Sequence, residues 1–161
     1  AAAYNADEKE LCRLDEIYSA VKTPFEIRSG SEKVTRRFFK ICNNGRESFT
    51  GLYKNLTEQG ICKGHQCIAY GLYMRDNGIE LSEGLAVYGY SICSAIVTNC
   101  VKLVPLSQLA GQKILGESFE LISSASEKAL FTDINDIGIS GAGFDLRAMQ
   151  HERLYSRQYM S

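Results

Sequence analysis

Apolar residues recur along the first half of the chain at the three- and four-residue spacing of amphipathic helices. Asp7 and Glu10 have the spacing of a capping box and predict a helix start. The apolar stripe behind them consists of Leu11, Leu14, Ile17 and Val21. Comparable stripes predict three further helices over about residues 23–42, 49–59 and 65–75. The first of these three begins at Thr23-Pro24-Phe25-Glu26, with Thr23 as the expected N-cap and Pro24 as the first helical residue.

The segment from Ser82 to Val104 is the least polar part of the chain, and it carries no formal charge between Leu85 and Val101. An apolar stretch of this length is compatible with a membrane span. Polar side chains are nevertheless spread around the whole helix, which weakens its preference for lipid. We therefore favour a central core helix that the other helices surround and in which Ile96 is buried.

Two more helices are expected after Pro105, a long one over about residues 107–131 and a short one over about residues 145–154. The strict alternation of apolar and polar residues that marks β-strands is nearly absent. The pattern thus predicts an all-α fold, a single bundle of about six to seven helices around the central apolar helix. The length suits one hydrophobic core, and we expect one domain over residues 1–161.

Charge and composition narrow the class of protein. The 161 residues include 18 Lys plus Arg and 19 Asp plus Glu, so no cationic surplus is available for a nucleic acid. Hydrophobic residues make up 45% and charged residues 23%, as in folded proteins. The six cysteines are too few and too scattered for a disulfide scaffold, and no secretory signal opens the sequence. We expect free thiols and a cytoplasmic protein that binds neither nucleic acid nor membrane.

Cys62, His65 and Cys67 lie close together in the sequence and are candidate ligands of a soft or borderline metal ion. Structural zinc sites use four ligands, usually in two spaced pairs, and the matching second pair is missing from the sequence. The alternative interpretation is a loop histidine beside two incidental thiols. A small Cys/His metal-binding or redox protein is the alternative function. Because the sequence has no G-x-S-x-G, P-loop or H-E-x-x-H motif, we expect no enzyme activity.

The C-terminal end contains two features of interest. His151 and Glu152 could be read as an acid–base pair, but a terminal helix offers no pocket, and a capping or ion-pair role is favoured. The tail over residues 155–161 is rich in the side chains that dominate protein interfaces, namely Tyr155, Arg157, Tyr159 and Met160. The tail either docks on a partner or folds back on its own domain.

Three segments match motifs of one known family. The ending contains Met149-Gln150-His151-Glu152, Tyr155-Ser156-Arg157 and Ser161, similar to M-(R/Q)-H-E-x-x-Y-S-R-L-(F/Y)-x-S. The stretch from Asn99 to Gln108, with Gly111-Gln112 and Leu115 after it, is similar to V-(K/R)-x-V-P-L-(G/S)-Q-x-x-G-Q-x-x-L, and Pro24 to Arg28 is similar to an E-L-R helix opening. From about Thr23 to Ser161 the chain thus resembles the UreF family of urease accessory proteins. It departs from the family at Gln158, which replaces a usual Leu, and it lacks the family's N-terminal F-P-x-G-x-(Y/F)-x-x-S-x-G-L-E motif.

The resemblance implies an all-helical, homodimeric and non-catalytic scaffold. Members of the family assemble with UreH (also called UreD) and the GTPase UreG on the urease apoenzyme, and the assembly couples GTP hydrolysis to nickel delivery. The resemblance implies no tightly bound cofactor, with nickel at most in transit. The partner-binding residues that it implies are His151, Tyr155, Ser156, Arg157, Tyr159, Met160 and Ser161, of which Arg157 is expected to recruit UreG.

Overall fold

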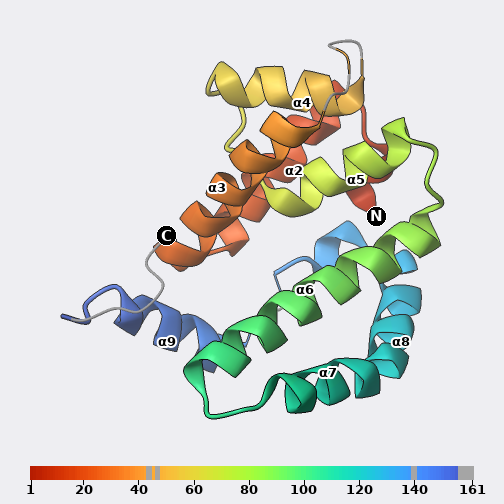
Figure 1. The fold of residues 1–161 in the computed structure, drawn as a ribbon. Coiled ribbons are helices and arrows are strands. Elements are labelled where there is room, and N and C mark those ends of the chain that lie inside the picture. Colours follow the sequence, from red (N-terminus) through yellow and green to blue (C-terminus); the bar gives the residue numbers. More distant parts are fainter. Residues whose placement is uncertain (43–44, 46–47, 139–140, 156–161) are drawn as a thin grey trace. The chain divides into compact units, whose positions relative to one another are not determined.

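The computed structural model describes residues 1–42, 45, 48–138 and 141–155. The described residues are 77% helical and contain no strand, which confirms the all-α fold class. The described chain has nine α-helices where six to seven were expected, together with a 3-10 turn at Ile134–Asp136. The helices, labelled in Figure 1, are α1 (Ala2–Asn5), α2 (Glu8–Val21), α3 (Phe25–Ile41), α4 (Phe49–Glu58), α5 (Gln66–Asp76), α6 (Leu81–Leu103), α7 (Gln108–Glu117), α8 (Phe119–Leu130) and α9 (Ala142–His151).

These helices form two compact units. The terminal unit contains Ala2–Asn77 and the described residues from Asp133 onward, and so holds α1 to α5 and α9. The middle unit contains Gly78–Thr132, and so holds α6, α7 and α8. The expectation of one domain over residues 1–161 stays a prediction.

The hydrophobic core of the terminal unit is formed by α1 to α5. Leu11 from α2, Tyr53 from α4 and Leu72 from α5 are completely buried, and Phe39 from α3 packs edge-on against the ring of Tyr53. The core also takes in Cys62, which lies in the connection between α4 and α5. Helices α2 to α5 begin within a residue or two of the predicted positions.

The local sequence predicts the N-cap of α2 correctly and places the N-cap of α3 one residue too early. Asp7 caps α2 as predicted, since its carboxylate accepts a hydrogen bond from the backbone N–H of Glu10 at 2.8 Å. The expected N-cap of α3, Thr23, is off by one residue, because Pro24 has extended backbone angles and takes the N-cap position itself. Proline has no side-chain acceptor, so the first N–H groups of α3 need a partner from elsewhere.

The middle unit is built on α6, which packs against both α7 and α8 (Figure 1). Glycine allows the close approach at both contacts. A Cβ atom on Gly111 of α7 would lie 2.6 Å from Cγ2 of Val101, and one on Gly89 of α6 would lie 3.0 Å from Cγ2 of Ile122. The apolar central helix is therefore present as predicted.

The predicted burial of this helix is wrong. Ile96, expected in the core, is 56% exposed, and the buried residue of α6 is Gly84. Two neighbouring helices cover only part of the circumference of a third, so a long, largely apolar helix keeps exposed apolar side chains within such a unit.

The long helix predicted over residues 107–131 is also wrong, because it is two helices. The boundary between them is Ser118, which is the C-cap of α7 and the N-cap of α8. Its hydroxyl donates a hydrogen bond to the carbonyl of Ile114 at 2.8 Å. Leu115 and Ile122 are buried, whereas Leu109 and Leu121 are exposed.

One helix of the described chain, α6, is long and apolar enough to cross a bilayer, with a mean hydropathy of 1.4. Its most apolar window is only 6% buried. The finding rests on length and composition alone, and one such helix is weak evidence for a membrane span. The prediction that the protein does not bind a membrane stays a prediction.

Candidate partner-docking site

The C-terminal helix α9 is fixed to the start of α3 by two adjacent side chains. Nδ1 of His151 lies 2.5 Å from Oε2 of Glu26, which makes a hydrogen-bonded ion pair when the imidazole is protonated. The next residue, Glu152, accepts a hydrogen bond from the backbone N–H of Phe25 at 3.1 Å. We call these two contacts the α3–α9 clamp. These contacts agree with the capping or ion-pair role predicted for His151 and Glu152, since Glu152 caps α3 and His151 is hydrogen-bonded to Glu26.

The clamp follows from the way α3 begins. The first N–H groups of a helix carry partial positive charge and attract carboxylates. Because Pro24 supplies no acceptor, the carboxylate of Glu152 takes the place of a local N-cap, 127 residues further along the chain. Glu26 in the first turn of α3 then faces the imidazole of His151.

Residues 153–155, which follow the clamp, are exposed to solvent. Leu154 is exposed, and Tyr155 has a relative exposure of 107%. Phe144 and Leu146 of α9 are also exposed. The residues immediately before the tail are therefore held in place, while Leu154 and Tyr155 stay uncovered. The other candidate partner-binding residues, Ser156, Arg157, Tyr159, Met160 and Ser161, lie outside the described residues.

His65, one of the three candidate metal ligands, is held by contacts to side chains of α2. His65 is completely buried, its Nε2 lies 2.7 Å from the hydroxyl oxygen of Ser19, and its ring packs against that of Tyr18 at 4.7 Å between centroids. Burial lowers the pKa of His65 below its ordinary value of 6.5, although Asp15 and Glu32 act in the opposite direction.

The thiols give no further support to a metal centre. Burial raises the pKa of Cys67 and raises the pKa of Cys62 to about 12, whereas a soft metal ion requires thiolates. Among the residues that the structure describes, no three His, Cys, Asp or Glu side chains are grouped so that they could hold a metal ion.

A buried network around Asp15 was not predicted from the sequence. Its carboxylate accepts hydrogen bonds from the hydroxyl of Tyr53 at 2.6 Å and from the backbone N–H groups of Lys63 and Gly64 at 2.7 and 3.0 Å. The Tyr53 hydroxyl in turn accepts a hydrogen bond from the N–H of His65 at 2.8 Å. Burial, followed by the charge of Asp15, raises the pKa of Tyr53 far above its ordinary value. The network fixes the connection between α4 and α5, and the position of Asp15 four residues after Leu11, on the apolar side of the helix, was its one sequence signal.

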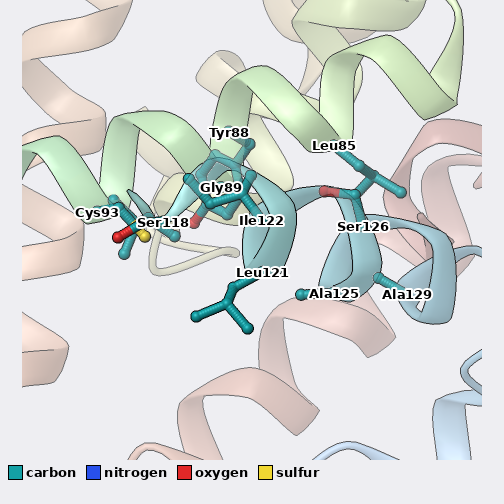
Figure 2. Close-up of a pocket in the computed structure, with 11 residues that line it drawn as sticks. Leu85, Tyr88, Gly89, Cys93, Ser118, Leu121, Ile122, Ala125, Ser126 and Ala129 are labelled. Carbon is teal, nitrogen blue, oxygen red and sulfur yellow. The ribbon is translucent and has the colours of Figure 1, made fainter. Parts of the chain in front are cut away.

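The middle unit contains an apolar pocket of about 500 Å³ (Figure 2). Figure 2 shows that its walls come from α6 and α8, and they include Leu85, Tyr88, Cys93, Ile122, Ala125 and Ala129. The lining is carbon with a few hydroxyl and thiol groups and contains no carboxylate, imidazole or amine. Acid–base catalysis needs such groups, so this pocket suits apolar packing.

The fold and the site define the class: a helical protein with a clamped terminal helix that exposes large side chains. Within that class, the family model UreF matches residues 1–118, and the chain belongs to the UreF family.

Sequence relatives agree with this assignment. The chain is 34% identical over 161 residues to the urease accessory protein UreF of Actinobacillus pleuropneumoniae serotype 5b (strain L20), a match that covers 99% of this chain and 71% of the relative. It is 31% identical over 152 residues to that of Paenarthrobacter aurescens (strain TC1), covering 92% and 67%. It is 34% identical over 152 residues to that of Haemophilus influenzae (strain ATCC 51907 / DSM 11121 / KW20 / Rd), covering 94% and 65%.

Proposed function

We propose that the chain acts as a non-catalytic scaffold in urease maturation, in the cytoplasm. It joins UreH (UreD) and the GTPase UreG in a complex with the urease apoenzyme. Nickel passes through that complex without a tight site on this chain. Membership of the UreF family supports the general role, and the partners are those that the resemblance of the terminal motif implies.

The observation that carries the proposal is the geometry of α9. A chain end with exposed aromatic and aliphatic side chains normally frays. Here the α3–α9 clamp fixes the residues immediately before the tail, while Leu154 and Tyr155 stay exposed. Because the residues before the tail are already fixed, the tail loses less conformational entropy when it binds. The same contacts therefore give a higher affinity. The tail also contains tyrosine, methionine and arginine, residue types that are enriched at protein interfaces.

A truncation tests the proposal directly. A variant that ends at Leu154 keeps the clamp and removes the tail. We expect it to fold as the full chain does and to lose most of its affinity for UreH, measured by titration calorimetry. Arg157→Ala should leave the melting temperature unchanged and weaken the recruitment of UreG to a preformed complex with UreH. Full affinity of the truncated chain for UreH would contradict the proposal.

The proposed scaffold is a homodimer. Exposed apolar side chains on α6, among them Val87, Ile92 and Ile96, support self-association, because a monomer rarely leaves a large apolar surface uncovered. We expect sedimentation velocity without detergent to give twice the monomer mass and Ile96→Lys to shift the protein toward the monomer. A protein that stays in solution only with detergent would instead favour the bilayer interpretation of α6.

A further inference from the structure

Two cysteine sulfurs from distant parts of the sequence meet in the terminal unit. The thiol of Cys62, in the connection between α4 and α5, donates a hydrogen bond to Sγ of Cys12 on α2, and the two sulfur atoms are 3.8 Å apart. A disulfide bond measures about 2.05 Å, so each sulfur would have to move by about 1 Å to form one. Side-chain rotation supplies a movement of this size.

The backbone on both sides of the pair is fixed. Cys12 lies within the second turn of α2. The N–H of Cys62 donates to the carbonyl of Leu56 at 3.2 Å, and the two residues that follow Cys62 donate to the buried carboxylate of Asp15. The sulfur contact is therefore held by the fold on each side and is more than a chance approach of two mobile thiols.

The two thiols differ in access to solvent. Cys62 is 2% exposed, whereas Cys12 is partly exposed. Burial, assisted by the nearby carboxylate of Asp15, raises the pKa of Cys62 to about 12, so this thiol keeps its proton at neutral pH. An oxidant that arrives from solvent therefore meets Cys12 first.

We propose that Cys12 and Cys62 form a reversible dithiol–disulfide modification site whose oxidant is a small soluble disulfide of the glutathione class. The Cys12 thiolate attacks one sulfur of the glutathione disulfide, which forms a mixed disulfide and releases one glutathione thiolate. Cys62 then attacks the Cys12 sulfur of the mixed disulfide, loses its proton, and expels the second glutathione, which leaves as the thiol. In total two protein thiols are oxidised to one disulfide and one glutathione disulfide is reduced to two glutathione molecules.

The disulfide between Cys12 and Cys62 would act as a cross-link within the terminal unit. It joins α2 to the connection after α4 and closes a loop between residues 50 positions apart. Such a cross-link restricts the unfolded chain more than the folded one. Oxidation should therefore stabilise the terminal unit, and reduction should return it to the state described above. This inference is independent of the proposed scaffold role.

Intact-mass and peptide analysis of the full chain test the proposal. After incubation with glutathione disulfide and alkylation of the remaining thiols, we expect a peptide pair joined through Cys12 and Cys62. We also expect a melting temperature raised by about 5–15 °C, which dithiothreitol reverses. Cys12→Ser should abolish both effects, whereas Cys100→Ser, which changes an exposed cysteine of α6, should keep both.

The peptide pair is measured on the unmodified sequence, so the test stands even if a variant folds poorly. Absence of the Cys12–Cys62 peptide pair, whether or not other thiols react, would overturn the proposal. So would a mixed disulfide with glutathione on Cys12 that persists without a second exchange.

Discussion

At the scale of single residues, Asp15 is the side chain on which the connection between α4 and α5 depends. Its carboxylate accepts hydrogen bonds from Tyr53, Lys63 and Gly64. Asp15→Ala leaves these three donors, two of them in buried bonds, without their acceptor, and we expect the free energy of unfolding to fall by about 3 kcal/mol. Urea denaturation followed by circular dichroism measures the change. Asp7→Ala, which removes an exposed helix cap, should cost only about 1 kcal/mol, and equal losses for the two variants would contradict the assigned role.

The lowered pKa of the buried His65 imidazole predicts how the free energy of unfolding depends on pH. Because burial lowers its pKa in the folded state, the unfolded chain binds a proton near pH 6.5 while the folded chain does not. The contribution of His65 is therefore complete above pH 6.5 and is lost as the pH falls below that value, by at most about 1.4 kcal/mol per pH unit. Between pH 7.5 and pH 5.5, we expect His65→Gln to lose less unfolding free energy than the unmodified chain. An identical pH dependence for both proteins would show that His65 does not titrate in this way.

At the scale of helices, the contact between α6 and α7 depends on Gly111. A methyl group there would lie 2.6 Å from Val101 and 3.3 Å from Val97, so Gly111→Ala should destabilise the middle unit by about 1–3 kcal/mol. Gly116 of the same helix has no atom within 4 Å of an added Cβ, and Gly116→Ala should be neutral or stabilise by up to about 1 kcal/mol. Differential scanning calorimetry of the two variants measures the contrast. Equal melting temperatures would mean that α6 and α7 are not in close contact.

The helices also show why part of the fold could be predicted and part could not. The start of α2 depends on Asp7 and Glu10, which lie three residues apart, so a local pattern was sufficient. The burial of Ile96 depends on which helices surround α6, and an apolar pattern does not contain that information. The break at Ser118 was missed because apolar residues continue on both sides of it at helical spacing.

At the scale of the whole molecule, only part of the candidate site was predicted, because a sequence pattern detects neighbouring residues and not contacts between distant ones. His151 and the tail were identified from a motif of neighbouring residues. The partner of His151, Glu26, is 125 residues away, and Phe25, the residue at the start of α3 that Glu152 caps, is 127 residues from Glu152. Only the folded chain brings these groups together, so the clamp was beyond the reach of sequence patterns. The Asp15 network and the Cys12–Cys62 contact were missed for the same reason.

The clamp gives the last prediction, which concerns binding. Glu26→Gln removes the charge that faces His151 and leaves α3 and the tail sequence intact, so the protein should fold with little change. The base of the tail should then be ordered only on binding, at a cost of about 1 kcal/mol, and the Kd for UreH should rise roughly fivefold. Glu32→Gln is the matched control, because Glu32 lies on the same helix but pairs with Arg36 of α3 itself.

The comparison of this variant with the chain that ends at Leu154 separates positioning from contact. If the tail alone binds UreH, truncation should remove the affinity and Glu26→Gln should leave it unchanged, which would contradict a positioning role for the clamp. If α9 presents the tail in a fixed orientation, Glu26→Gln should weaken the full chain but have no further effect in the truncated one. The two changes would then be non-additive, as expected for groups that act through the same segment.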